Sequence, residues 1–505
     1  MTQDSRASPG PAGTDSPTPT RESRGLDDFD PPQPTPDQCG TGSEIDASPA
    51  AEDPHQSTGL LRVLRHRHFR IFWIAAFGSF VGNWFEFIGT QWIVAESTGS
   101  LVWLAHIGAA QLLPTLVLGL LGGIVADRVN RKKLLLVTQF LMMLIALAFF
   151  AVVWLNVASP PVLLALALAQ GITLAFNTPA WQVMIPRLVP RSELVAAITI
   201  QGISFNAARA IGPAIAGLIM YAFGGHWLFL INAISFVGVL LAVMTTPDAP
   251  APARDGGRLF DLSTIAADIR HACAFMFLRP GPRAALLAIL IFSTLATPVL
   301  RFLPMFVKDV YHLSEATFGV LTGIMGVGAV AGGFAMKLVP TWYPRHHFIP
   351  LSILLGGVWI LVFALATDVR LAGIFMFFVG VFWMWAFNSS MSALQLLVDD
   401  TLRGRVLAVC NTLSLGLMPA GAYLAGLAGD GASTLLRGRW PHYWDPGIAA
   451  QSGIALCALG LIGAGVVMLI WRTPEVDGVP ATGTPQARQP GFLRGLTASA
   501  HRPRR

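Results

Sequence analysis

The chain has 505 residues, of which 53% are hydrophobic and only 12% charged, and its formal net charge is +6. Soluble globular proteins carry about a quarter charged residues, so this composition excludes an ordinary soluble domain. The basic residues stand in short segments between apolar runs, which favours contact with a membrane surface over binding of nucleic acid.

The two ends of the chain differ from its middle. Residues 1–58 are rich in Pro, Ser, Thr, Asp and Gly and contain few aliphatic clusters. Such a segment buries too little apolar surface to offset the entropy of ordering it, so we predict a disordered tail. It contains no apolar stretch typical of a cleavable signal peptide. Residues 473–505 are predicted to form a second, basic tail.

Twelve apolar runs lie between the tails, each long enough for the roughly 20 helical residues that cross a bilayer. They cover about 70–95, 102–126, 134–155, 161–185, 194–222, 226–246, 284–308, 314–337, 348–367, 371–398, 404–429 and 448–471. The runs lack the alternation of half-buried strands. The sequence therefore predicts an all-α integral membrane protein with twelve transmembrane helices.

The distribution of positive charge gives the expected orientation. Basic residues gather in alternate segments, at 62–70, 128–133, 187–191, 254–283, 337–345 and 403–405, whereas the other loops hold only Lys308, Arg370, Arg437 and Arg439. Cytoplasmic loops carry the excess of Lys and Arg. We therefore expect a multi-pass protein of a bacterial-type inner membrane with both termini in the cytoplasm.

The longest basic segment, 247–283, is predicted to be a cytoplasmic loop between two six-helix halves, at 60–246 and 284–472. The halves share features in equivalent helices, namely Gly122-Gly123 and Gly332-Gly333, Asn177 and Asn388, and Pro213 and Pro419. Such an internal repeat around a central site is a transporter architecture.

Residues 123–132, GIVADRVNRK, resemble the signature G-x-x-x-D-R-x-G-R-K that joins helices two and three in the major facilitator superfamily. Asn130 replaces the second glycine of that signature. Because Asn tolerates a positive φ better than most residues, we expect the turn to be kept.

The resemblance implies a gate formed by Gly123, Asp127, Arg128 and Arg131. In the family fold the paired glycines let helix two pack against the start of helix eleven, and the contact breaks when the inner side opens. A carboxylate at Asp127 would be stabilised by the N-terminus of that helix, by about 0.3–2 kcal/mol. The alternative is that these basic residues only set the topology.

Helix five contains Arg209, Gly212, Pro213 and Gly217, and its GPAIAG stretch is similar to the G-P-x-x-G-G motif of exporters in the superfamily. The stretches GNW at 82–84 and NTPA at 177–180 resemble the enterobactin-exporter-like branch, whose members are transmembrane secretion effectors. The resemblance covers residues 60–472.

Three charged residues fall deep within the predicted helices: Glu86, Arg209 and Arg301. Charges inside a membrane are costly and mark functional sites. Glu86 is the candidate for proton coupling, with a permanent pair to an Arg as the alternative. Arg209 either anchors the two halves or binds an anion, and Arg301 contributes either to the substrate cavity or to the outer interface.

The remaining cavity candidates are neutral polar residues of helices four and ten: Asn177, Gln182, Asn388 and Gln395. With the neighbouring tryptophans they suit an amphipathic or aromatic solute. For each tryptophan, helix packing is the competing interpretation.

The sequence contains no Walker loop, so an ion gradient is the expected energy source. We predict a monomeric secondary transporter that exports a siderophore-like or drug-like small molecule, with proton antiport and alternating access. An importer or facilitator is the alternative within the superfamily. A membrane enzyme or scaffold is disfavoured because the helices lack a catalytic constellation. The four cysteines have no metal-like spacing, and we expect no metal and no cofactor.

Overall fold

The computed structural model describes residues 60–246, 262–340, 342–443 and 445–477. Within these ranges the chain contains twelve helices long and apolar enough to cross a membrane, and no strand. The predicted all-α, twelve-helix fold class is therefore confirmed. The predicted tail at 1–58, the first part of the central loop at 247–261 and the end of the chain from residue 478 lie outside the described residues.

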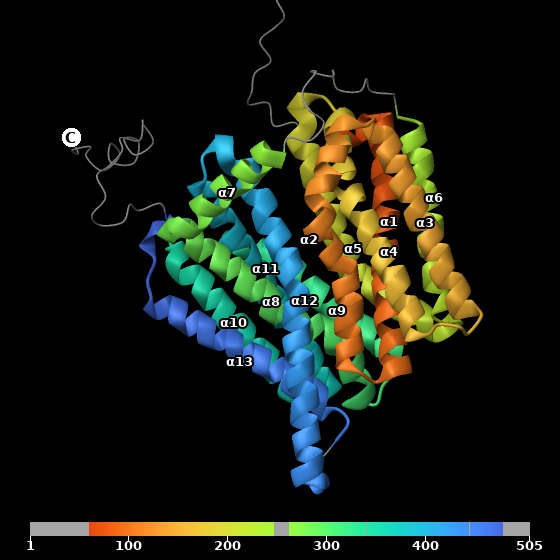
Figure 1. Ribbon diagram of the computed structural model, residues 1–505, viewed down its shortest axis with the longest axis vertical. Helices are drawn as coiled ribbons and strands as arrows, with labels where there is room; N and C mark the ends of the chain where they lie inside the picture. The colour runs from red at the N-terminus through yellow and green to blue at the C-terminus, as the bar shows by residue number, and fades with distance from the viewer. Residues whose placement is uncertain (1–59, 247–261, 341, 444, 478–505) are drawn as a thin grey trace, which may run out of the picture. The chain divides into compact units, whose positions relative to one another are not determined.

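The first half consists of a short 3-10 helix and six long helices (Figure 1). They are η1 (Leu60–Arg65), α1 (Arg67–Thr98), α2 (Leu101–Arg128), α3 (Arg131–Trp154), α4 (Pro160–Met184), α5 (Leu194–Phe223) and α6 (His226–Met244), with the 3-10 turns η2 (Ile185–Arg187) and η3 (Arg191–Glu193) before α5.

The second half lies beside the first and begins with a shorter helix. Its elements are α7 (Leu262–Leu278), α8 (Pro280–Asp309), α9 (Glu315–Ala335), η4 (Met336–Leu338), α10 (Arg345–Leu365), α11 (Val369–Leu397), α12 (Asp400–Arg439), η5 (Pro441–Tyr443), α13 (Ile448–Ile470) and η6 (Pro474–Asp477).

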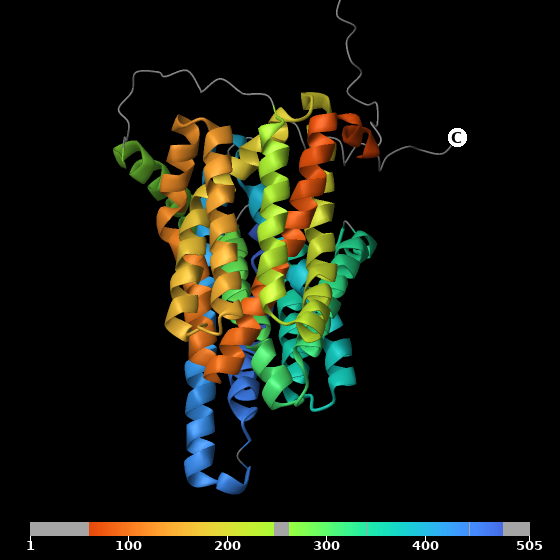
Figure 2. The ribbon, with the colours of Figure 1, turned by 90° about the vertical axis from the view of Figure 1, so that its right-hand side faces the viewer.

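Two helices differ from the sequence prediction. The eleventh span, expected to end at residue 429, continues as α12 to Arg439 through Gly429 and Gly431. Figure 2 shows the end of this helix projecting beyond the other helices. Helix α7 lies within the segment predicted as a loop and packs through the buried Ala272, Phe275 and Met276.

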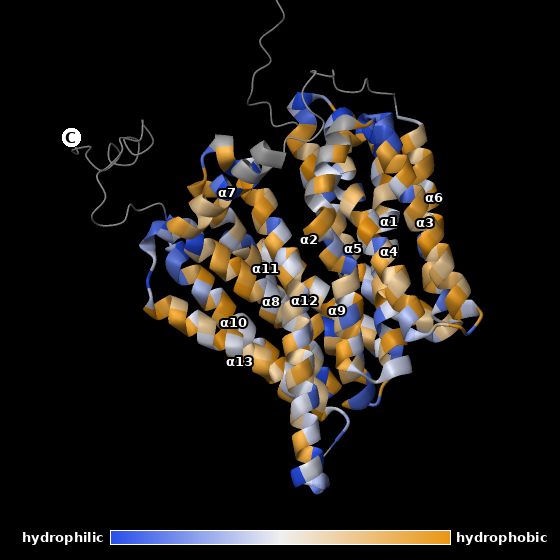
Figure 3. Cartoon of the chain, viewed as in Figure 1, coloured by the Kyte–Doolittle hydropathy of each residue, from blue (hydrophilic) through white to orange (hydrophobic). Residues whose placement is uncertain are grey.

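One end of the bundle is marked by basic residues, and we call it the basic end. Helices α1, α3 and α10 all begin there, at Arg67, Arg131 and Arg345, and hydrophilic residues gather at this end (Figure 3). Helices α3, α6 and α13 expose large apolar side chains along their lengths, such as Val137, Ile234 and Leu456. An exposed apolar surface of this kind fits contact with lipid.

Glycines permit equivalent close contacts in the two halves. Gly122 of α2 faces the backbone of Ala175 on α4, and Gly332 of α9 faces the backbone of Val381 on α11. Small residues let membrane helices approach closely. One glycine of each pair recognised in the sequence thus contributes the same helix contact, second on fourth, in each half.

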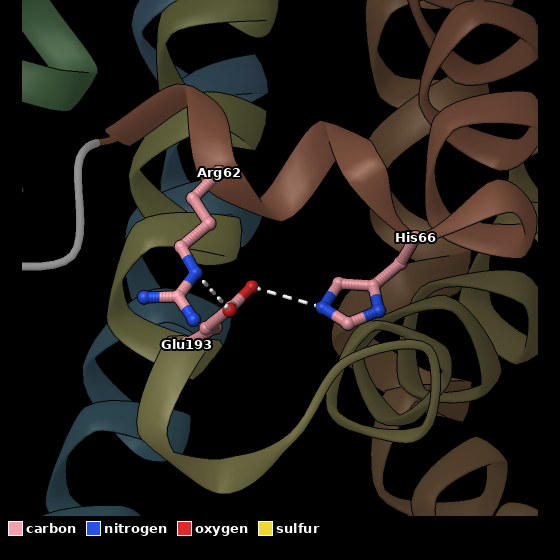
Figure 4. Close-up of polar contacts among 3 residues, drawn as sticks. All are labelled: Arg62, His66 and Glu193. Atoms are coloured by element: carbon pink, nitrogen blue, oxygen red, sulfur yellow. Dashed lines mark hydrogen bonds and ion pairs between the residues drawn. The ribbon is translucent and has the colours of Figure 1, made fainter.

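At the basic end, η1 is fixed to the start of α5 (Figure 4). Glu193 is buried, and its two carboxyl oxygens pair with Arg62 Nε at 3.5 Å and His66 Nε2 at 3.0 Å. In the second half η6 plays a comparable part, because Asp477 accepts a hydrogen bond of 2.6 Å from the backbone nitrogen of Arg345 and pairs with His346.

Candidate functional site

Glu86 is buried inside the first half, with 2% of its surface exposed. Its Oε2 accepts a hydrogen bond of 2.6 Å from Asn232 Nδ2 on α6, and the side chain of Gln170 on α4 approaches the same carboxyl group. Its Oε1 has no hydrogen-bond partner among the described residues. The observed partner of Glu86 is therefore a neutral amide.

Gly82, one turn before Glu86, makes room for this contact. A Cβ atom at Gly82 would overlap Asn232 Oδ1 and lie 2.7 Å from Ser235 Oγ. Ser235 in turn donates a 2.7 Å hydrogen bond to the backbone oxygen of Asn232. Helices α1 and α6 therefore approach closely at Gly82, and α6 presents Asn232 to the carboxyl group.

Arg301 crosses from the second half to the first. Only 7% of it is exposed, and its Nη1 donates a 3.2 Å hydrogen bond to Gln111 Oε1 on α2. Its Cζ lies 5.3 Å from the ring centroid of Phe87 on α1. A Cβ atom at Gly108 would lie 3.0 Å from this Cζ, so a glycine is what admits the guanidinium.

Arg209 on α5 makes the reverse contact, from the first half to the second. Its Cζ lies 5.7 Å from the ring centroid of Trp383 on α11, and that indole packs edge-on against Phe292 of α8, at 5.3 Å between centroids. Among the described residues, neither Arg209 nor Arg301 forms a salt bridge with a carboxylate.

Two aromatic side chains of α1 link the surroundings of Arg301 to those of Arg209. Trp84 and Phe87 pack edge-to-face, with centroids 5.5 Å apart. A Cβ atom at Gly212, one turn beyond Arg209 on α5, would lie 2.9 Å from Trp84 Cβ. We call the resulting set the junction cluster, and its members are Trp84, Phe87, Gln111, Arg209, Arg301 and Trp383.

The helix-five motif forms a contact between the halves. A Cβ atom at Gly319 of α9 would lie 2.7 Å from Gly217 Cα, and Gly319 also faces the backbone oxygen of the buried Pro213. One turn further along α9, Gly323 packs against Ala214. Small residues thus bring α5 and α9 to backbone contact across the two halves.

The neutral polar candidates have separate contacts. Asn177 is buried, and its Oδ1 accepts hydrogen bonds from Thr138 Oγ1 at 3.0 Å and Gln139 Nε2 at 3.1 Å, which joins α4 to α3. Asn388 donates to the sulfur of Met384 on its own helix. Gln182 and Gln395 are exposed.

The signature loop differs from the expectation in two respects. Asn130 has φ −60°, not a positive value, and its side chain caps α3 by accepting from the backbone nitrogens of Lys132 and Lys133. The prediction of a left-handed residue was wrong because Asn satisfies the free N–H groups of a helix start. Gly122 packs on α4 rather than on α12, and Gly123 has no neighbour within 4 Å of a Cβ position.

A contact between α2 and α12 among the described residues lies further from the basic end than the signature loop. A Cβ atom at Gly416 would lie 2.6 Å from Leu116. The side chains of Asp127 and Arg128 lie outside the described part of the chain, and Arg131 stands at the first position of α3. The gate attributed to these residues stays a prediction.

Comparison with known proteins agrees with this fold and these motifs. A family model described as "Transmembrane secretion effector" matches residues 58–437. The chain belongs to this family of major facilitator transporters. It is 26% identical over 363 residues to the staphyloferrin A transporter of Staphylococcus aureus, which covers 72% of this chain and 89% of the relative. The multidrug efflux pump Tap of Mycolicibacterium fortuitum is 25% identical, over 71% of this chain and 88% of the pump.

Solved structures show the same fold. A bacterial homologue of the human lysosomal transporter Spinster, in an inward-facing and unoccupied conformation, superposes with a TM-score of 0.60 at 15% identity, covering 82% of this chain and 96% of that chain. The nucleoside transporter NupG superposes with a TM-score of 0.55 at 14% identity, covering 80% of this chain and 98% of that chain. Likeness at this level of identity shows the fold alone, whereas membership of the family makes the chain a multi-pass membrane transporter and not an enzyme.

Proposed function

We propose that this protein exports a small organic solute by proton antiport, and that Glu86 is the proton-carrying group. The observation that carries the proposal is the isolation of this carboxyl group. It is buried in α1, bonded to the amide of Asn232 and without a basic partner among the described residues. A carboxyl group in an apolar interior without a countercharge is favoured in its neutral form, and a change of its surroundings can release the proton.

Asn232 suits a partner that alternates between two protonation states. An amide offers both a donor and an acceptor, so it can bond to a carboxylate through its nitrogen and to a protonated carboxyl group through its oxygen. A lysine or arginine in the same place would favour the charged form alone. The pairing therefore permits loading and release of a proton without loss of the hydrogen bond.

The proposal also includes an orientation in the membrane and a gate. The basic end would face the cytoplasm of a bacterial plasma membrane, with both termini there. Backbone contacts of α5 with α9 lie away from that end. Alternating access would separate these contacts while Asp127, Arg128 and Arg131 close the basic end with α12. The protein would work as a monomer in the lipid bilayer.

The cargo is proposed to be siderophore-like or drug-like. The relatives with these motifs are named for staphyloferrin A transport, multidrug efflux and macrolide efflux. An importer or facilitator of an organic solute is the second candidate, because secondary transporters of one fold can run in either direction with the gradient.

The test is the substitution Glu86→Gln in inside-out membrane vesicles. Accumulation of staphyloferrin A and of erythromycin is measured with and without an imposed pH gradient. Glutamine keeps the shape and the hydrogen bond to Asn232 but cannot carry a proton. We expect the wild type to accumulate at least one solute when the vesicle interior is acidic. The variant should lose the pH-driven component and keep solute exchange.

The matched control is Glu96→Gln, which removes an exposed carboxylate from the same helix. It should transport as the wild type does. Undiminished pH-driven transport by Glu86→Gln would remove this residue from the mechanism. Transport in the opposite direction would favour the importer.

A further inference from the structure

We propose that the junction cluster binds the transported solute through an anionic group, and that the substrate class is therefore an organic anion bearing a carboxylate. This inference rests on the proposed transport function, because it assigns the solute site of the same transporter.

The cluster carries positive charge that the described structure leaves uncompensated. Arg301 is almost fully buried, and its observed partners are the neutral Gln111 and Phe87. Arg209 packs against Trp383 and makes no hydrogen bond or salt bridge within the described residues. The buried acid Glu86 faces Asn232. Charges in a low-dielectric interior are costly unless paired, so an anion that pairs with either guanidinium group of the cluster is stabilised.

The hydrogen-bonding capacity points to a planar oxyanion. A guanidinium has five N–H donors in a rigid fork that matches a carboxylate. Gln111 accepts one of those of Arg301, through Nη1. The guanidinium of Arg209 retains all of its donors. A carboxylate can therefore be held by paired hydrogen bonds without the loss of an existing one.

The aromatic residues favour an organic anion over a small inorganic one. Trp84 and Trp383 are only partly buried, and Trp383 lies over Arg209 while Trp84 packs on the following turn of α5. Binding sites for organic solutes combine apolar walls with a few placed polar groups. An aromatic ring beside a cation lets an aromatic or amphipathic anion bind through its apolar part and through its charged group.

The position between the halves gives the ligand a role in the transport cycle. Arg209 belongs to the first half and contacts Trp383 of the second, whereas Arg301 belongs to the second half and contacts α1 and α2 of the first. A ligand shifts a conformational equilibrium only by binding its states unequally. An anion held by either guanidinium group would do so, because each group contacts residues of the opposite half and movement of the halves changes these contacts.

The test uses three probes of one shape and different charge: naphthalene-2-carboxylate, naphthalene-2-carboxamide and naphthalene-2-methylammonium. The full-length protein in detergent micelles is titrated with each, and the rise in Tm is followed by differential scanning calorimetry. A ligand that binds only the folded state stabilises it by RT ln(1 + [L]/Kd), so Tm rises with the ligand concentration relative to Kd. We expect only the carboxylate to do so. Its apparent affinity should fall at least about tenfold, or roughly 1.4 kcal/mol, in Arg209→Gln and Arg301→Gln.

Two variants keep the test decisive if a glutamine variant fails to fold. Arg209→Lys retains the charge and should keep part of the affinity. Gly108→Ala retains every charge but places a methyl group 3.0 Å from Arg301 Cζ, so it should weaken binding of the carboxylate. Arg370→Gln removes an exposed arginine at the start of α11 and should bind the carboxylate as the wild type does.

The proposal is overturned if the carboxamide or the ammonium probe stabilises the protein as well as the carboxylate does. It is also overturned if none of the probes raises Tm at millimolar concentration, or if Arg209→Gln binds the carboxylate unchanged. Binding by Glu86→Gln separates this proposal from the transport mechanism. If Glu86→Gln loses pH-driven transport but binds the carboxylate as the wild type does, both proposals are supported. If the wild type binds the carboxylate but shows no pH-driven transport, only the anion site is supported.

Discussion

The backbone contact of α5 with α9 makes Gly319→Ala a test of how the halves move. A Cβ atom at this position would lie 2.7 Å from Gly217 Cα and 2.8 Å from Gly217 N. Carbon atoms pack favourably at about 3.5–4.0 Å, so the helices would have to separate by about 0.8 Å. The backbone oxygen of Pro213 lies closer still, and because all three obstructing atoms belong to the backbone, no side-chain rotation relieves the contact.

Overpacking of this kind costs about 1–3 kcal/mol, which is about 5- to 150-fold in an equilibrium constant. If alternating access separates α5 from α9, the strain falls only on the arrangement described here. The variant should then populate the alternative arrangement more strongly. If the contact persists throughout the cycle, both arrangements are strained equally and only the stability falls.

Double electron–electron resonance, which measures the distance between two spin labels, distinguishes these cases. Labels on Leu155→Cys and Thr367→Cys, in a background without the native cysteines, report the separation of the halves at the end opposite the basic end. Both positions are exposed. The matched control is Gly202→Ala on α5, where a Cβ atom has no neighbour within 4 Å. A distance distribution for Gly319→Ala identical to that of this control would refute the reasoning.

Two further substitutions address the proton site and the gate. Gly82→Ala places a methyl group against Asn232 and Ser235, so pH-driven accumulation in vesicles should fall although Glu86 is intact, whereas Gly78→Ala, in open space on the same helix, should be silent. Asp127→Lys should insert normally, because the loop stays basic, but it should slow net transport in the same vesicles; a normal transport rate with correct insertion would contradict the gate.

The sequence predicted the helices well because about 20 apolar residues in a row have few alternatives in a membrane protein. The errors of the sequence prediction occur where single residue types do not determine whether a helix begins or ends. Gly429-Asp430-Gly431 indicates a helix end, yet α12 continues to Arg439, where Arg437 and Arg439 in the last turn favour the C-terminal end of a helix dipole. Helix α7 was missed because its 17 residues are too few to span and lie among charges.

The candidate site could be predicted only in part. Glu86, Arg209 and Arg301 stand out because charges are rare in apolar runs, and this signal needs no knowledge of packing. Their partners Asn232, Phe87 and Gln111 come from other helices, and their choice depends on helix rotation that the apolar pattern does not specify. Gln111 carried a usable signal, since it is a polar residue within an apolar run.

The placement of acid and cations suggests how proton and solute would be coupled. Glu86 and Phe87 are consecutive on α1, yet Glu86 bonds to α6 while Phe87 packs on Arg301 of the second half. Consecutive helical residues point about 100° apart, so α1 joins the proposed proton site to the proposed anion site. Direct charge pairing between Glu86 and the anion is not needed. A rotation or tilt of α1 that accompanies loss of the proton would change the contact of Phe87 with Arg301, so the proton and the anion would bias the same helix.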